Sequence, residues 1–341
     1  MEWSCFYTIH DFDAKLWSRV SNGNPCLSYD FMSIVESLHP KDKFCYLTLN
    51  QKNTTIGIAF YYITNPLPSF LRWIKFANIL MTGTYETYGC HYWYDSNVIS
   101  EDTFLEKLWT IIKKERPFAY IIRDYVSNSY NQESFFARRF FRHIVPYSVS
   151  ILTIPEKCSD IDVYLQPLPK KHRNTYRKII RERQTQNIRI DEVYDIENHI
   201  SELYPLYLTV NKRAKEFKTP PLHTSFFLQL QHAFGPNCLC LRLIHNNDTI
   251  GFVLIIKGKQ EITPFLMGIN YNYRHLHVWH NLTIECISYA LRENYTKIDL
   301  GLTNYELKKR LGAKKIAINM QARFRNSLLN RIFNPMLDKL I

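Results

Sequence analysis

The stretch EITPFLMGINYNYRHLHVWHNLTIECISYALRENYTKIDLGL, residues 261–302, carries two strand patterns on either side of a helix pattern. Residues 261–269 and 297–302 are short, mostly apolar runs, as is typical of strands. Between them, apolar side chains recur at helical spacing over residues 278–293, at Leu282, Ile284, Cys286, Ile287, Ala290 and Leu291. The segment therefore predicts a strand, a helix and a second strand in succession.

The elements around this stretch form a similar series in each half of the chain. In the second half, strands over 238–245 and 249–257 flank a hairpin turn, and a short helix (304–311) and a strand (314–324) come last. The first half predicts strands over 44–50 and 54–64, a helix over 102–115, a strand over 118–126, a short helix ending within 135–141 and a strand pair within 142–154. We interpret the two series as a structural duplication with a linker over Pro155–Pro169.

Composition excludes several classes of protein. The chain has 341 residues, 46% hydrophobic and 15% aromatic, which excludes a disordered or collagen-like chain. It has only 10 Gly and no GxGxxG, GxxxxGK[ST] or GxSxG motif, which disfavours dinucleotide-binding, P-loop and α/β-hydrolase folds. We find no secretory signal and no apolar run of ~18 residues, and we expect a cytoplasmic protein without a transmembrane segment. The 8 Cys, with no CxxC pair, are expected to be reduced, buried residues.

The charge is concentrated in the second half of the chain. Residues 1–155 hold 15 Lys and Arg against 14 Asp and Glu, whereas residues 156–341 hold 28 against 17. Arg173, Arg177 and Arg181 recur at i, i+4 and i+8, so they form one stripe on a helix, and Lys170 extends it. The stripe predicts an anion-binding surface for tRNA, a lipid headgroup or a nucleotide-linked acceptor. An ordinary solvated helix is the alternative.

Several segments together resemble the FemAB-like branch of the GNAT-type N-acyltransferases. The matching segments are LPKKHRNTYRKIIRER (168–183), NDTIGFVLIIK (247–257), FLMGIN (265–270) and IDLGLTNYELKKRLGA (298–313). An early tryptophan and LSYDFMSIVES (27–37) resemble the first domain of such tandem proteins. The resemblance implies an α/β (α+β) fold class with two tandem GNAT-like domains, each a mixed β-sheet flanked by helices. We expect a degenerate domain over 1–155 and an acyltransferase domain over 156–341.

The resemblance also implies where a donor would bind. In this fold two parallel strands splay apart, and the gap holds the pantetheine arm or its equivalent. Here these strands would be 261–269 and 297–300. The donor phosphates would lie at the N-terminus of the helix that begins near Val278, where free N–H groups and the helix dipole favour anions. The implied donor-binding residues are Met267, Gly268, Ile269, Asn270, Arg274, His275, His277 and His280.

One segment departs from the family pattern. CoA-using members usually carry Arg/Gln-x-x-Gly-x-Gly/Ala in the phosphate loop, whereas this chain has NYNYRHLHVWHN without glycine. Larger side chains obstruct the approach of a pyrophosphate to the backbone. Fem-type aminoacyltransferases, which use charged tRNA, also lack the glycine signature. Arg274, His275 and His277 could supply contacts to phosphate instead.

Amide formation requires stabilisation of an oxyanion and a proton for the leaving group. Tyr305 and Lys308 are three residues apart and share a helix face. The resemblance implies that Lys308 stabilises the oxyanion or an acceptor phosphate and that Tyr305 protonates the leaving group. Asp299 is a candidate base or a structural ion-pair partner, and Glu285 is a weaker candidate base. A solvated Lys308 and a packing Tyr305 are the alternatives.

The leading function is N-acyl transfer from an acyl-CoA-type donor to a primary amine by direct attack. No nucleophile motif suggests an acyl-enzyme. The alternatives are a Fem-type transferase that uses aminoacyl-tRNA and a non-catalytic protein that binds nucleic acid or anionic headgroups. His275, His277 and His280 do not converge at ligand spacing, so we expect no metal.

Overall fold

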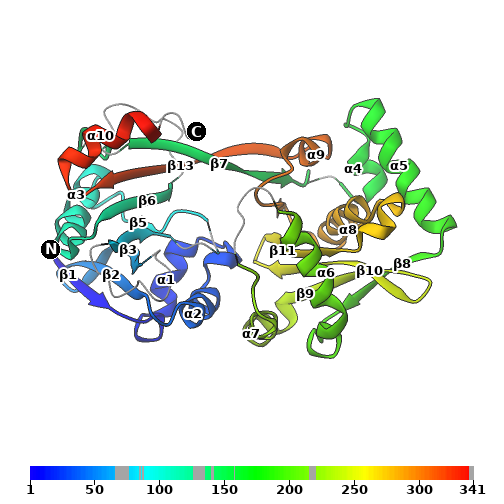
Figure 1. The fold of residues 1–341 in the computed structure, drawn as a ribbon, viewed down its shortest axis with the longest axis horizontal. Coiled ribbons are helices and arrows are strands. Elements are labelled where there is room, and N and C mark those ends of the chain that lie inside the picture. The colour runs from blue at the N-terminus through cyan, green and yellow to red at the C-terminus, as the bar shows by residue number, and fades with distance from the viewer. Residues whose placement is uncertain are drawn as a thin grey trace. The chain divides into compact units, whose positions relative to one another are not determined.

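The computed structural model describes residues 1–65, 77–83, 86, 88–125, 135–139, 142–156, 158–214 and 220–337 (Figure 1). The chain divides into two compact units. Unit 1 comprises Met1–Asn22, Cys26–Tyr147 and Ala317–Ile341, and unit 2 comprises Gly23–Pro25 and Ser148–Ile316. The sequence places its boundary at 155/156 instead. The difference arises because two long strands, Arg142–Thr153 (β7) and Lys314–Phe324 (β13), each contain a boundary between the units.

Unit 1 is built on a mixed sheet with the strand order β1-β2-β3-β4-β6-β13, and β5 also pairs with β3. Its other elements are Glu2–Phe6 (β1), Ala14–Ser21 (α1), Tyr29–Leu38 (α2), Lys43–Gln51 (β2), Thr54–Thr64 (β3), Ile79–Thr82 (β4), Tyr92–Tyr94 (β5), Glu101–Ile112 (α3), Ala119–Tyr125 (β6) and Ser327–Leu337 (α10). Ser28 and Ser100 cap α2 and α3, because each hydroxyl accepts a backbone N–H of the first turn. The parallel strands β4 and β6 pair along all four residues of β4.

Unit 2 is built on a second mixed sheet with the order β7-β12-β11-β10-β9-β8. Its other elements are Ile161–Leu165 (α4), Lys170–Thr185 (α5), Ile188–Val193 (β8), Ile200–Arg213 (α6), Thr224–Phe234 (α7), Cys238–His245 (β9), Asp248–Lys257 (β10), Glu261–Ile269 (β11), Val278–Arg292 (α8), Lys297–Asp299 (β12) and Tyr305–Arg310 (α9). Every strand pair in this sheet is antiparallel except β11 with β12. The architecture expected from the sequence, mixed sheets flanked by helices, is therefore present.

Two glycines let helices approach this sheet closely from opposite faces. A Cβ on Gly251 would lie 2.4 Å from Cγ1 of Val278 on α8. A Cβ on Gly268 would lie 2.2 Å from the Phe252 ring and 2.7 Å from the backbone N of Tyr207 on α6. Residues next to each other in a strand point to opposite faces, and Gly268 pairs with Phe252, the neighbour of Gly251. Hence α8 covers one face and α6 the other.

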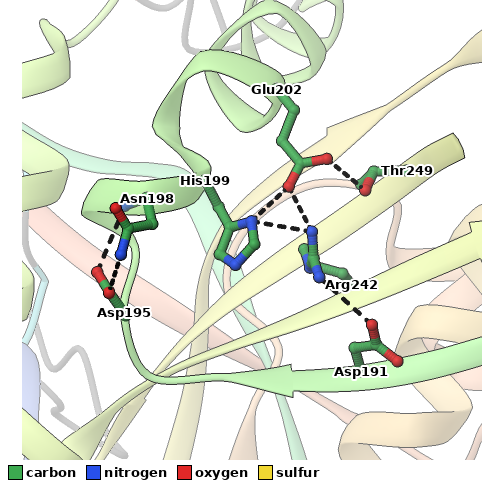
Figure 2. A network of polar contacts seen from close by, with 7 residues as sticks. All are labelled: Asp191, Asp195, Asn198, His199, Glu202, Arg242 and Thr249. Carbon is green, nitrogen blue, oxygen red and sulfur yellow. Dashed lines mark hydrogen bonds and ion pairs between the residues drawn. The ribbon is translucent and has the colours of Figure 1, made fainter.

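A polar network ties α6 to three strands (Figure 2). The Arg242 guanidinium on β9 donates to Glu202 on α6 and, at 3.3 Å, to Asp191 on β8. Glu202 also accepts from the Thr249 hydroxyl on β10 at 2.7 Å and lies 2.7 Å from Nδ1 of His199. The Arg242 side chain is only 13% exposed, so its charge needs these carboxylates. The network therefore fixes the start of α6.

Glu202 gives this network a dependence on pH. Burial raises the pKa of Glu202. Hydrogen bonds from Thr249 and His199 and the charge of Arg242 together lower it by more than burial raises it, so the net pKa is below the usual 4.5. The pKa of this carboxyl is lower in the folded chain than in the unfolded chain. Its ionised form therefore stabilises the fold at pH values above the pKa of the unfolded chain. This stabilisation is lost as the pH falls through the pKa of the folded chain.

Glu202→Gln is therefore expected to lower the free energy of unfolding by about 1 kcal/mol at pH 7, a value kept small because solvent partly screens the pair. The difference from the parent chain should shrink below pH 4.5. Denaturant titrations at pH 7 and pH 4 measure it, with the exposed Glu197→Gln as the matched control. An equal effect of Glu202→Gln at both pH values would contradict this assignment.

Three local expectations are wrong. The predicted strand pair within 142–154 is one strand, β7. The predicted linker over 155–169 contains α4, because Tyr164 and Leu165 are buried in the core of unit 2. The cysteines are not all free thiols, because Cys5 and Cys45 on the adjacent strands β1 and β2 form a disulfide.

Candidate active site

The parallel strands β11 and β12 separate after two residue pairs. Glu261 pairs with Lys297 and Ile262 with Ile298, after which β11 continues to Ile269 without β12 beside it. The register of β11 against β10 shifts between Pro264 and Leu266, so Phe265 is the extra residue of a bulge. A bulge bends its strand and leaves the extra residue outside the regular ladder. The separation expected for residues 261–269 and 297–300 is thus present in unit 2.

A cavity of about 260 Å³ lies at this separation. Its wall combines apolar side chains with polar groups and comes from β11, α6, α8, α9 and the segment that leads into α9. The lining residues are Val210, Pro264, Phe265, Met267, Ile269, Tyr271, Trp279, Thr283, Cys286, Leu300, Leu302, Thr303, Asn304 and Lys308. Lys308 is the charged group in this wall, within the part of the chain that the structure describes.

Lys308 lines the cavity, and its amine is bonded to backbone carbonyls. Its side chain is buried, with 6% of the residue exposed, while Lys309 and Arg310 beside it are exposed. Nζ donates to the carbonyl of Gly301 at 3.2 Å and to that of Leu302. Burial lowers the pKa of Lys308 to about 8, against the opposing effect of the Asp299 charge. The amine can therefore act as a cation below pH 8 and lose its proton just above it.

The other two predicted catalytic residues lie close to Lys308 in the chain but have different contacts. The Tyr305 hydroxyl oxygen accepts the backbone N–H of Ser148 at 3.1 Å, and Nζ of Lys315 lies 4.5 Å from the Tyr305 ring centre. Asp299 is buried and accepts the backbone N–H of Gly301 at 2.9 Å. Asp299 thus holds the turn whose carbonyl Lys308 binds. Neither Tyr305 nor Asp299 belongs to the described wall of the cavity.

The segment between β11 and α8 is a 3₁₀ helix, Tyr271–Leu276, rather than an open glycine loop. Asn270 caps this helix by accepting the backbone N–H of Asn272 at 3.1 Å. His277 follows in the left-handed region, with φ of +53°, where glycine is usual. Arg274 and His275 are exposed at this end of α8. This segment therefore differs from the glycine-containing loop that the family resemblance leads us to expect.

Two histidines lie at the start of α8 beside α5. Nε2 of His277 is 3.8 Å from the Glu182 carboxylate, and the His277 and His280 rings are 5.9 Å apart. Burial lowers the pKa of His280 to about 4, and the charges of His277 and Arg310 lower it further. His280 is thus neutral at pH 7. No group of three metal-ligating side chains occurs among the described residues.

The predicted basic stripe on α5 is partly engaged within unit 2. Arg173 donates to the carbonyls of Gln166 and Leu168, at 2.6 Å and 3.4 Å. Arg177 forms an ion pair with Asp162 at 3.3 Å, and Arg181 donates to the carbonyl of Arg177. Lys170 and Arg181 are exposed at the two ends of the stripe.

Glu285, the weaker candidate base, has a structural partner. Its carboxylate accepts from Arg183 on α5 at 2.8 Å, and the second oxygen lies 4.0 Å from Arg292. Both Glu285 and Arg183 are largely shielded from solvent. This pair joins α8 to α5.

Sequence reasoning located part of the cavity wall. Met267 and Ile269 line it, whereas Gly268 faces α6. The contribution of α8 was missed: Trp279, Thr283 and Cys286 line the cavity at i, i+4 and i+7. This spacing marks one helix face and was visible in the sequence, but the pattern alone does not separate a cavity wall from the core.

The region that contains the splayed strands and the cavity matches a known sequence family. Residues 170–309 match the acetyltransferase (GNAT) domain. These residues form a GNAT-type acyltransferase domain. No curated protein is significantly similar to this acyltransferase in sequence.

Solved structures extend the fold assignment beyond the matched domain. FemX is 12% identical with a TM-score of 0.63, over 97% of this acyltransferase and 99% of FemX. A tandem GNAT protein from the clavulanic acid biosynthesis pathway is 9% identical with a TM-score of 0.57, over 95% and 99%. The C-terminal domain of a putative lysylphosphatidylglycerol synthetase from Agrobacterium fabrum is 11% identical with a TM-score of 0.54, over 89% of each chain. The acyltransferase therefore has the FemAB-like tandem GNAT fold.

Proposed function

We propose that this acyltransferase moves an acyl group from an acyl-CoA-type thioester to a primary amine in the cytoplasm. The observation that carries the proposal is the cavity between β11 and β12, with the buried amine of Lys308 in its wall. An elongated donor arm fits such a gap, because β11 is not paired with β12 there.

The reaction proceeds by direct attack in this proposal. The neutral amine of the acceptor forms the C–N bond at the thioester carbonyl, the C–S bond breaks, and the thiolate leaves with a proton. Lys308, as a cation, stabilises the oxyanion that develops. Tyr305 protonates the leaving thiolate, and Asp299 holds the turn that positions Lys308 or acts as a base.

The cavity between β11 and β12 also suggests which residues bind the donor. Met267 and Ile269 contact the donor arm, and Gly268 keeps α6 against β11. Anionic groups of the donor would lie at the N-terminus of α8, where Asn270, Arg274, His275, His277 and His280 are placed. We assign this role to the predicted domain over 156–341. The predicted N-terminal domain over 1–155 is degenerate in this proposal, because β4 and β6 stay paired where β11 and β12 separate.

Calorimetric titration with acetyl-CoA and a longer acyl-CoA tests the donor. We expect saturable binding in the micromolar range for at least one of them, and competition by desulfo-CoA. No heat of binding with any of these ligands would contradict the proposal and leave aminoacyl-tRNA as the next donor to titrate.

The phosphate segment favours a second candidate, transfer from aminoacyl-tRNA. A 3₁₀ helix with His277 at the left-handed position occupies the place of the glycine-rich loop, so backbone contact with a pyrophosphate is hindered. The exposed Lys170 and Arg181 on α5 are available to an RNA backbone. This candidate keeps Lys308 in the same role and changes only the donor.

Lys170→Glu with Arg181→Glu separates the two candidates. If tRNA is the donor, the double variant should weaken tRNA binding about tenfold or more, and the dependence of log K on log salt should become shallower by ~1 or more. Filter binding at 50 mM and 200 mM salt measures both quantities, with Lys41→Glu and Lys52→Glu, exposed in unit 1, as the control. Parent-level affinity at low salt would exclude this helix as an RNA contact.

A further inference from the structure

The outer face of α10, in unit 1, is unusually apolar for an exposed surface. Leu328 is 59% exposed and Ile332 is 51% exposed, one helical turn apart. Asn330 between them is buried and fixes the rotation of the helix. Its side chain accepts the backbone N–H of Phe324 at 2.8 Å and donates to the Phe324 carbonyl at 2.9 Å. With Asn330 facing the unit, Leu328 and Ile332 must face outward.

A basic loop lies against the start of α10. The backbone N–H of Arg325 donates to the Phe118 carbonyl at 2.9 Å, and its guanidinium donates to the Arg116 carbonyl at 2.7 Å. Phe118 is itself 38% exposed and packs edge-on against Phe324. The same loop carries exposed Lys113 and Lys114. The exposed Phe118 thus lies on a loop that is bonded to the segment leading into α10, the helix that carries the exposed Leu328 and Ile332.

This surface is strongly cationic. Lys113, Lys114 and Arg116 are exposed on the loop, and Arg325 and Arg331 on the helix side. The carboxylate of the loop, Glu115, is already bonded to Lys43 at 2.8 Å and to the Tyr61 hydroxyl at 2.8 Å. Residues 307–337 of the sequence contain no Asp or Glu. The five cations therefore lack carboxylate partners in their own segments.

We propose that this surface, defined by Phe118, Leu328 and Ile332 with the five cations around them, docks on an anionic lipid bilayer. Aliphatic side chains on one helix face insert at the boundary between headgroups and acyl chains, and flanking Lys and Arg are attracted to anionic lipids. A nucleic acid would use the cations but not the exposed leucine and isoleucine. None of the helices in the described residues is long and apolar enough to cross a bilayer. The surface thus provides peripheral attachment, which does not depend on the identity of the acyl donor.

Co-sedimentation of the full chain with vesicles tests the proposal. We expect at least tenfold stronger binding to phosphatidylcholine vesicles with 30% phosphatidylglycerol than to pure phosphatidylcholine, and loss of most binding at 0.5 M salt. Leu328→Gln with Ile332→Gln should reduce binding about tenfold or more, and Lys114→Glu with Arg331→Glu should do the same. The matched controls are Val98→Gln, an exposed apolar residue elsewhere in unit 1, and Lys41→Glu with Lys52→Glu.

Three results would overturn the proposal. The first is equal or absent binding to both kinds of vesicle by the parent chain. The second is binding that survives the glutamine substitutions. The third is a concentration-dependent dimer in sedimentation velocity that these substitutions abolish, since this face would then contact a second copy. Thermal melts of each variant confirm that a loss of binding is not a loss of folding. Acyl transfer to a soluble amine should be unchanged in the glutamine variant.

Discussion

Lys308→Met is expected to lower kcat/KM for acyl transfer by about 10²–10³-fold, the usual effect of removing one oxyanion-stabilising group. An unbranched apolar side chain still lines the cavity, but the amine that bonds the carbonyls of Gly301 and Leu302 is lost. Initial rates with the donor that binds in calorimetry measure the effect. Lys309→Met, an exposed neighbour on the same helix, is the control. Parent-level activity in Lys308→Met would remove this residue from the mechanism.

The pH profile distinguishes a catalytic from a structural role of Lys308. Because burial lowers the pKa of Lys308 to about 8, a cationic role predicts that kcat/KM falls as pH rises through 8. At lower pH, kcat/KM is expected to rise with pH, because the acceptor amine must lose its proton before it can attack. Lys308→Arg keeps the charge at all accessible pH values, so the falling limb should move upward in that variant. If the falling limb lies at the same pH in Lys308→Arg as in the parent chain, the decrease in rate is caused by a group other than Lys308.

Met267→Trp is expected to weaken donor binding about 100-fold or more. Met267 lies on the separated part of β11 and lines the cavity, and an indole ring there would occupy much of its volume of about 260 Å³. Met267 is only partly buried, so the larger ring has room to turn without disturbing the sheet. Calorimetric titration of the variant measures the loss.

Met267→Leu is the matched control, because it conserves volume and apolar character and should bind the donor like the parent chain. Thermal melts of both variants should lie within a few degrees of the parent. Donor affinity in Met267→Trp equal to that of the parent would show that the donor does not enter the space between β11 and β12.

Several strands in the second half of the chain were predictable from local pattern. The predicted strands 238–245, 261–269 and 314–324 coincide with β9, β11 and β13. Each is an apolar or alternating run bounded by turn residues, so the pattern sets its ends. The helices α6 and α7 were not predicted, because their apolar faces are short and Pro205 lies inside α6. Their place is set by contacts such as that of Tyr207 with Gly268.

The charged residues show the limit of sequence reasoning. Arg173, Arg177 and Arg181 form the predicted stripe, yet Arg173 binds carbonyls of the preceding segment and Arg177 binds Asp162. Glu285 pairs with Arg183, a residue 102 positions away in the chain. Helical spacing predicts which side chains share a face, but partners from other elements decide which charges stay free.

The sequence by itself determined the strand–helix–strand series of each half, the net positive charge and the helix face shared by Tyr305 and Lys308, because these depend on residue type and local spacing; the role of Lys308 came from the family resemblance. Only the tertiary structure decided that Lys308 is buried while Lys309 and Arg310 are exposed. It also decided that β11 and β12 separate after two pairs while β4 and β6 remain paired. Burial and strand separation arise from packing between distant segments, and no pattern within one segment encodes them.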